Sequence, residues 1–169
     1  MINKIVLRKP FIGDLKKLLI WENDLKNTSF TDHPFFYSID DLQDFLNSDQ
    51  ELLIDNQKRF IISFDEEAIG CIDLYAFDLV NSRAGVGVFI DSKFRSQGFG
   101  TMSIQLLKKI SIKDYSINSL YAEISCKNEP SIKAFEKSGF IKNGIKKSWL
   151  RTQESFEDVI FYQCFLLNN

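Results

Sequence analysis

One segment restricts the folds open to this chain more than any other, because it joins a strand to a helix through a glycine-rich loop. Residues 86–90 form an apolar run, residues 95–100 read Arg-Ser-Gln-Gly-Phe-Gly, and apolar residues then recur at helical spacing. Such a loop leaves free backbone N–H groups at the start of the helix, where geometry and the helix dipole favour an anion. Gly98 and Gly100 keep side chains away from the ligand, and Arg95 adds positive charge. The segment therefore predicts a phosphate-binding loop.

Two common phosphate-binding motifs fit this loop poorly. It lacks the Gly-Lys-Ser/Thr ending of nucleotide hydrolases, and residues 98–103 lack the last glycine of a dinucleotide-binding fingerprint. Nucleotide hydrolysis and hydride transfer are therefore disfavoured. From the glycines alone, an ordinary turn remains the alternative.

The pattern along the chain predicts a mixed α/β (α+β) domain without repeats. Strands are expected near residues 3–8, 60–64, 69–75, 85–90, 120–124, 140–150 and 159–166. Helices are expected after Asp14, after Ser38, after the glycine loop and from about Pro130 to Lys137, the last one ending at Gly139. A tight hairpin is expected at residues 65–67 and a longer connection at residues 78–83. With 169 residues, 44% of them hydrophobic, and no linker-like stretch, residues 1–169 are expected to form a single domain.

Composition argues against several classes of protein. A net charge of −2 gives no basic field for binding nucleic acid. Charged residues interrupt the N-terminal apolar run, which argues against a signal peptide or membrane span, so we expect a cytoplasmic protein. Three cysteines without metal-ligand spacing and a single histidine favour reduced thiols and disfavour a metal centre.

Two segments in the expected order resemble motifs of the GNAT N-acetyltransferases. Residues 95–100 look like that family's Arg/Gln-x-x-Gly-x-Gly/Ala loop, and residues 128–140, Asn-Glu-Pro-Ser-Ile-Lys-Ala-Phe-Glu-Lys-Ser-Gly-Phe, resemble a second family segment. Residues 7–8, 21–24 and 84–90 extend the similarity to the branch of ribosomal-protein alanine acetyltransferases and spermidine/diamine acetyltransferases. The resemblance implies a mostly antiparallel mixed sheet, flanked by helices and splayed between its fourth and fifth strands, with acetyl-CoA in the opening.

The resemblance also implies which residues hold acetyl-CoA. The loop and the start of its helix would bind the pyrophosphate, and the strand before the loop would pair with the pantetheine arm through its main chain. Asn128 matches an asparagine near the pantetheine end, although an Asn before a helix is also a common cap. The cofactor-binding residues expected are Val88, Phe89, Ile90, Arg95, Ser96, Gln97, Gly98, Phe99, Gly100, Thr101, Asn128 and Phe135.

The catalytic residues are less clearly marked. The family usually acts by direct attack of the amine in a ternary complex, and a tyrosine often protonates the leaving thiolate where this chain has Phe135. Ser131 is the candidate for the acid that replaces this tyrosine, although its hydroxyl could instead form a local hydrogen bond with the backbone. Water, or the released thiol itself, is the alternative to an acid from the protein. Glu123 is the candidate base because it alternates with apolar neighbours on its strand; Asp73 and a relayed water compete with it. Cys126 is disfavoured as a nucleophile.

Acidic residues suggest the acceptor. Glu22, Asp24 and Asp73 are candidates for a cation-attracting rim, which would favour a polyamine or a protein N-terminus over a neutral amino sugar; simple solvation of exposed acids is the alternative. Aromatic residues that could form the acceptor wall, or simply fill the core, are Trp21, Phe35, Phe36, Tyr75 and Trp149. The alternative function is a non-catalytic acyl-CoA-binding or interaction module, and a homodimer is left open.

Overall fold

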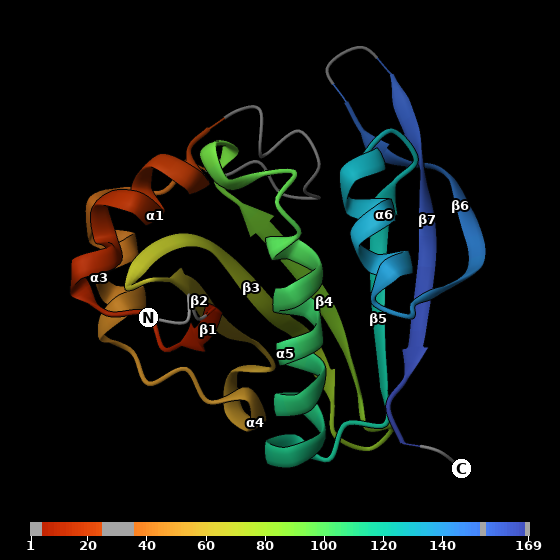
Figure 1. The fold of residues 1–169 in the computed structure, drawn as a ribbon, viewed down its shortest axis with the longest axis horizontal. Helices are drawn as coiled ribbons and strands as arrows, with labels where there is room; N and C mark the ends of the chain where they lie inside the picture. The colour runs from red at the N-terminus through yellow and green to blue at the C-terminus, as the bar shows by residue number, and fades with distance from the viewer. Residues whose placement is uncertain (1–4, 25–35, 153–154, 168–169) are drawn as a thin grey trace.

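The computed structural model describes residues 5–24, 36–152 and 155–167, and these form one sheet of seven strands (Figure 1). The strands are β1 (Ile5–Arg8), β2 (Lys58–Phe64), β3 (Glu67–Asp78), β4 (Arg83–Ile90), β5 (Ser119–Ser125), β6 (Ile141–Arg151) and β7 (Phe156–Phe165). Their order across the sheet is β1-β2-β3-β4-β5-β7-β6. Only β4 and β5 pair in parallel among these neighbours, which confirms the mostly antiparallel mixed sheet expected from the sequence.

Helices cover both faces of the sheet. They are α1 (Leu15–Glu22), α3 (Ile39–Asn47), α4 (Leu52–Asp55), α5 (Phe99–Tyr115) and α6 (Glu129–Lys137), with short 3-10 turns η1 (Ile12–Asp14) and η2 (Ser92–Phe94). Alternate residues of β2 face two different cores: Ile62 packs in the cluster that includes Leu107 of α5, and Ile61 packs with Leu18 of α1 and Leu42 of α3. No helix within the described residues has the length and apolar character needed to cross a membrane.

The fourth and fifth strands separate soon after they meet. Their pairing covers only Arg83 to Gly85 on β4 and Ser119 to Tyr121 on β5, so the remaining halves of both strands diverge. Figure 1 shows the two strands together near the lower end of α5 and apart at the opposite end. The splayed sheet is thus confirmed, and it leaves one edge of β4 without a strand partner beyond Gly85 in the part of the chain described.

Local signals in the sequence place most helix ends correctly. Ser38 caps α3: its Oγ accepts a hydrogen bond from the Asp41 N–H at 3.1 Å, and Asp41 accepts one from the Ser38 N–H. Gly139, at φ +86°, follows the end of α6 as expected. Asp14 precedes α1 without a side-chain cap; its carboxylate instead accepts the Phe11 N–H and pairs with Arg8.

The two turns expected around β3 are confirmed, and one helix was not expected. β2 and β3 turn at Asp65 and Glu66, whereas the connection between β3 and β4 is longer, from residue 79 to residue 82, because β3 ends at Asp78 and β4 begins at Arg83. The short helix α4 was not expected from the sequence, since four residues carry too little periodicity to be recognised.

A bulge in the β2–β3 hairpin sets which side chains stand opposite each other. The strands turn at Asp65 and Glu66, and their register shifts by one residue between Ile62 and Ser63. As a result Arg59 stands directly opposite Asp73. Cross-strand partners on one face lie within contact distance, so the bulge brings a guanidinium and a carboxylate together.

Candidate active site

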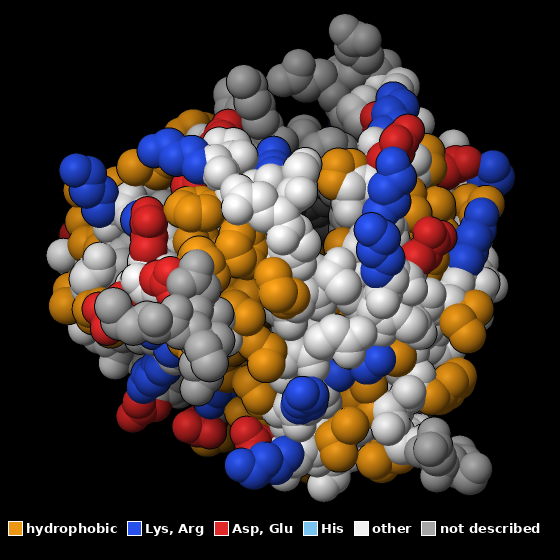
Figure 2. All heavy atoms as spheres, viewed as in Figure 1, with side chains coloured by type: hydrophobic (Ala, Val, Ile, Leu, Met, Phe, Trp, Pro, Cys, Tyr) orange, Lys and Arg blue, Asp and Glu red, His pale blue; other side chains and the backbone are white. Residues whose placement is uncertain are grey.

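A cleft of about 930 Å³ occupies the opening between β4 and β5. Its walls come from β4, the loop after it, the first turn of α5, the second half of β5 and α6. Figure 2 shows a hollow between the two halves of the molecule at the same place. The divergence of the two strands therefore creates a site large enough for an extended ligand.

The loop predicted to bind phosphate forms one end of this cleft. Ser96 and Gly98 adopt left-handed backbone conformations, with φ of +61° and +84°. These turns bring the start of α5 toward β4, where the N–H groups of the first helical turn lack carbonyl partners inside the helix. The Arg95 Nε donates a hydrogen bond to the Ile90 carbonyl at 2.9 Å, which ties the loop to the end of β4.

The two glycines of the loop meet different requirements. A side chain at Gly98 would meet no other atom within 4 Å, but the positive φ there strains any L residue. At Gly100 a Cβ would only make ordinary contacts with Ala134 and Ile90. The protein itself therefore leaves space above both positions, as an anion held by the helix N-terminus requires.

Nearly all of the expected cofactor-binding residues line this cleft. Those present in its walls are Val88, Phe89, Ile90, Arg95, Ser96, Gly98, Phe99, Gly100, Thr101, Asn128 and Phe135. Gln97 does not line it: its side-chain amide turns back and donates to the Lys93 carbonyl at 3.3 Å. Any contact between Gln97 and a cofactor in the cleft would have to come from the Gln97 main chain.

Helix α6 supplies the opposite wall of the cleft. The Asn128 Oδ1 accepts a hydrogen bond from the Ser131 N–H at 3.3 Å and so caps the helix, as the alternative interpretation of this residue proposed. Ser131 lines the cleft and is half-buried. Both residues thus lie at the helix start that borders the cleft, with the Ser131 backbone, not its hydroxyl, engaged by the cap.

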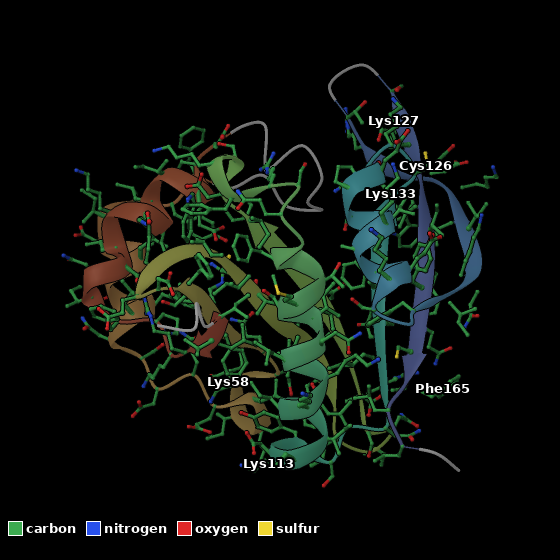
Figure 3. The ribbon with its side chains drawn as sticks, viewed as in Figure 1. Lys58, Lys113, Cys126, Lys127, Lys133 and Phe165 are labelled. Atoms are coloured by element: carbon green, nitrogen blue, oxygen red, sulfur yellow. The ribbon has the colours of Figure 1, made fainter. Side chains whose placement is uncertain are left out.

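Three lysines on this wall were not singled out from the sequence. Lys127, Lys133 and Lys137 line the cleft, and Figure 3 shows Lys127 and Lys133 beside α6. Figure 2 shows basic side chains gathered along the same side of the hollow. Lys133 and Lys137 are four residues apart on one helix, a spacing that places two side chains on one face and could have predicted this basic row. Their charge suits a ligand with several phosphates.

Phe135 places an aromatic ring without a hydroxyl group in the wall of the cleft. Its side chain is 2% exposed, lines the cleft and packs edge-on against Phe140 with ring centroids 4.9 Å apart. Tyr162 does not supply the missing hydroxyl, because it is not part of the cleft wall and its hydroxyl donates to Glu136 at 2.8 Å. Burial first, and the Glu136 carboxylate second, raise the pKa of Tyr162 to about 12, so it holds its proton.

Glu123, the candidate base, lies on the half of β5 that borders the cleft. The Lys146 Nζ on β6 contacts its Oε1 at 2.5 Å, and both side chains are partly exposed. Lys146 also lies over the ring of Trp149 at 4.5 Å from its centroid. The carboxylate is therefore held in place by an ammonium group from β6, which no local sequence pattern links to it.

At the other end of the cleft, two of the three candidate acceptor residues share one arginine. Arg59 donates from Nε and Nη2 to the two carboxylate oxygens of Asp73, both at 2.8 Å, and from Nη1 to Glu22 at 2.5 Å. Burial opposes the charged guanidinium, but the carboxylates of Asp73 and Glu22 outweigh it and raise the pKa of Arg59. The third candidate, Asp24, lines neither this cleft nor the chamber beside it.

A second chamber of about 600 Å³ adjoins the cleft at this point. Glu22, Tyr37, Arg59 and Asp73 line both spaces. Phe36 and Tyr75, two of the aromatic residues considered for the acceptor wall, line the second chamber, and Trp21 lines the cleft. Trp149 lies instead on β6 beside Lys146, and Phe35 is outside the described residues.

The cysteines do not offer a nucleophile to the cleft. Cys71 lines it, but burial raises the pKa of its thiol far above the ordinary value, which keeps the thiol protonated. Cys126 is exposed and is not part of the cleft wall. All three cysteines are free, and the described residues contain no cluster of side chains suited to a metal ion.

Comparison with known proteins decides the family. A family profile described as "Acetyltransferase (GNAT) domain" matches residues 4–141. The chain belongs to the GNAT acetyltransferases. It is therefore an N-acetyltransferase with acetyl-CoA as cosubstrate, which confirms the expected activity class and cosubstrate.

Individual relatives are distant in sequence but similar in fold. The chain is 24% identical over 162 residues to an uncharacterized N-acetyltransferase p20 of Bacillus licheniformis, covering 94% of this chain and 91% of the relative. It is 26% identical over 109 residues to a spermidine N(1)-acetyltransferase of Escherichia coli, covering 64% of this chain and 56% of the relative.

Solved structures show the same fold over almost the entire chain. A spermidine N-acetyltransferase from Vibrio cholerae, in complex with CoA and spermine, superposes with a TM-score of 0.85 at 20% identity, covering 96% of this chain and 95% of that one. A ribosomal L7/L12 alpha-N-protein acetyltransferase in complex with coenzyme A gives a TM-score of 0.82 at 18% identity, covering 95% and 93%.

Proposed function

We propose that this enzyme transfers the acetyl group of acetyl-CoA to a primary amine by direct attack in a ternary complex, with polyamines and protein N-termini as the favoured acceptor classes. The observation that carries the proposal is the cleft between β4 and β5, which joins the start of α5 to the chamber around Arg59. The donor and the acceptor can enter such a passage from opposite ends and meet where the strands diverge.

The residues around the cleft suit acetyl-CoA. The first turn of α5 and Arg95 would hold the pyrophosphate, and the row of lysines on α6 would add charge for further phosphate oxygens. The free edge of β4 at residues 88–90 would accept and donate main-chain hydrogen bonds to the amides of the pantetheine arm. Acetyl-CoA supplies the acetyl group and leaves as the free thiol.

The proton transfers require a base near the amine and a source of a proton for the thiolate. An attacking amine must lose its proton, and we assign this step to Glu123, directly or through one water, because its carboxylate is held at the cleft by Lys146. Ser131 is the proposed donor to the thiolate, since its hydroxyl borders the cleft where Phe135 has none. A carbon–nitrogen bond forms as the carbon–sulfur bond breaks, and no covalent enzyme intermediate is needed.

The proposal is tested by thiol release. Purified enzyme is incubated with acetyl-CoA and a panel containing spermidine, an alanine-starting peptide and an amino sugar, and the acetylated product is identified by mass. Thiol release that depends on an amine supports the proposal. If acetyl-CoA raises Tm but no amine on a broad panel triggers thiol release, the result would instead indicate the alternative, a non-catalytic acyl-CoA-binding module.

A further inference from the structure

Two glycines on β4 shape the acceptor side of the cleft in different ways. Gly85 and Gly87 lie two residues apart on the strand, so they face the same side of the sheet. A Cβ at Gly85 would lie 2.4 Å from two ring atoms of Tyr75, which shows that this ring rests directly on β4. A Cβ at Gly87 would meet no atom within 4 Å, and Gly87 lines the cleft. Strand β4 therefore carries an aromatic ring at one position and open space at the next position on that face.

The open space at Gly87 adjoins the candidate base. Asp73 stands opposite Gly87 on β3. On the other side Gly85 pairs with Tyr121 of β5, so Glu123 is the β5 position that corresponds to Gly87 once the two strands diverge. Glu123 also lines the cleft. An amine that approaches Glu123 over Gly87 therefore meets no side chain of β4.

Three aromatic rings, which we call the aromatic row, cross the sheet beside this space. The ring of Tyr75 meets that of Tyr121 edge-on with centroids 5.9 Å apart, and the ring of Tyr121 stacks on that of Phe161 with centroids 5.7 Å apart. Tyr75 lines the second chamber, which we call the acceptor chamber, and Phe161 stands opposite Glu123 in the β5–β7 pairing. The aromatic row thus extends from the acceptor chamber to the candidate base.

The aromatic row leaves apolar surface open to a ligand. The other face of β5 is covered by α6, whose Phe135 packs in the same core cluster as Ala122 and Ile124, whereas all three rings of the row are only half-buried. Single exposed apolar residues are common on protein surfaces, but three aromatic side chains in contact form a continuous surface whose burial is favourable. Because this surface adjoins the position of the reacting amine, the acceptor is the ligand best placed to cover it.

We infer that the aromatic row is an acceptor subsite for an apolar side chain on one of the first two residues of a peptide whose N-terminal amine is acetylated. This inference rests on the proposed function and narrows its acceptor class. Tyr121 lies two residues from Glu123 along β5, a distance of about 7 Å that the first two residues of an extended peptide span. The row is longer than one ring, so it suits successive residues of a chain. Its rings are uncharged, so their contact with an apolar side chain does not depend on the protonation of the amine.

The test uses a parent tetrapeptide amide, Ala-Ser-Gly-Ser, and two peptides in which phenylalanine replaces its first or its second residue. The readout is kcat/KM for each phenylalanine peptide divided by kcat/KM for the parent. This ratio compares two substrates of one enzyme preparation, so a partial loss of folded protein does not change it. For the wild-type enzyme at least one ratio is expected to be about ten, the effect of burying roughly half of a phenylalanine side chain.

Three variants locate the source of this preference. Tyr121→Ala removes the middle ring of the row and should bring the ratio close to that of a site without selectivity. Gly85→Ala keeps all three rings but places a methyl group where the Tyr75 ring lies, so it should displace that ring and lower the ratio about threefold. Phe165→Ala is the control, because Phe165 lies further along β7 at its lower end and is 65% exposed (Figure 3); the ratio should be unchanged.

Several outcomes would overturn the inference and leave the acetyltransferase intact. One is a wild-type enzyme that does not prefer either phenylalanine peptide, and another is a preference that persists in folded Tyr121→Ala. If spermidine is a better substrate than every peptide and its kcat/KM falls in Tyr121→Ala, the row binds a polyamine instead. If Tyr121→Ala has a lower mass in solution than the wild type, a second copy of the chain covers the row.

Two further results complete the test. If Tyr121→Ala does not fold, the wild-type ratios and Gly85→Ala decide, because an unchanged ratio in Gly85→Ala contradicts the inference. Absence of thiol release with every amine, while acetyl-CoA still raises Tm, would instead contradict the proposed function and, with it, the inference.

Discussion

The indole Nε1 of Trp21 donates a hydrogen bond to the Asp91 Oδ2 at 2.9 Å. Trp21 belongs to α1 and lines the cleft, whereas Asp91 follows β4 and caps the turn η2 by accepting the Lys93 N–H at 3.1 Å. One carboxylate therefore connects the helix beside the acceptor chamber to the turn that leads into the proposed pyrophosphate loop. The tilted packing of Trp21 on Phe89, with centroids 5.5 Å apart, strengthens this connection.

Replacing Asp91 by asparagine should weaken both contacts, because an amide accepts through only one oxygen and cannot accept two well-separated N–H donors. We expect a loss of about 1–3 kcal/mol in the free energy of unfolding, the usual cost of breaking a hydrogen bond to a charged group. Thermal unfolding and the KM for acetyl-CoA measure the effect. A Tm and KM equal to those of the wild type would show that the connection contributes nothing.

The same carboxylate predicts a pH dependence. Burial raises the pKa of Asp91, but the hydrogen bonds from Lys93 and Trp21 outweigh it and lower the pKa below the ordinary value of 3.8. A lowered pKa in the folded state stabilises the protein above the unfolded value and is lost as pH falls through the folded value. The Tm difference between wild type and Asp91→Asn should therefore be largest near neutral pH and shrink below about pH 4.

Thr101→Glu should weaken acetyl-CoA binding without unfolding the enzyme. Thr101 lies in the first turn of α5 and lines the cleft, so a carboxylate there stabilises the helix end but repels the pyrophosphate. Met102→Glu is the control, because Met102 occupies the next position, is 39% exposed and does not line the cleft. Titration by calorimetry should show about tenfold or greater weakening for Thr101→Glu only. Equal affinities in the two variants would exclude this loop as the phosphate site.

Ser131→Ala should lower kcat more than it weakens acetyl-CoA binding, because a general acid acts in the transition state. Loss of such a group costs about a hundredfold in rate. Ser138→Ala, at the C-terminal cap of the same helix, removes a hydroxyl that is buried away from the cleft and donates to the Ala134 carbonyl, so kcat should be unchanged. Phe135→Tyr is expected to raise kcat and to restore part of the loss in Ser131→Ala. Unaltered single-turnover rates in Ser131→Ala would refute its role.

Glu123→Gln should reduce kcat about a hundredfold, because an amide cannot take the proton of the attacking amine. The matched control is Asp158→Asn on β7, which breaks the ion pair with Lys147, the β6 residue next to Lys146, but lies outside the cleft. Both variants lose one carboxylate partner of a lysine. A kcat that falls no further in Glu123→Gln than in Asp158→Asn would transfer the role to Asp73 or to water.

Much of the fold follows from short-range features of the sequence. Capping at Ser38, the glycine stop at Gly139 and alternation along the strands each act over a few residues, so they can be recognised without knowing the tertiary structure. The glycine loop between β4 and α5 is local in the same sense: its backbone geometry is set by residues 95–100 themselves. For this reason the loop and the family could be recognised before any long-range contact was known.

The charge balance of the site was decided only by tertiary structure. Glu22 and Arg59 are 37 residues apart, and Glu123 and Lys146 are 23 apart, so no local pattern links them. Arg59 and Asp73 belong to one hairpin, but without the bulge at Ile62 and Ser63 the register would place Arg59 opposite Ile72. Because a one-residue shift moves a side chain to the other face of a sheet, the bulge, and not the composition, determines that Asp73 pairs with Arg59.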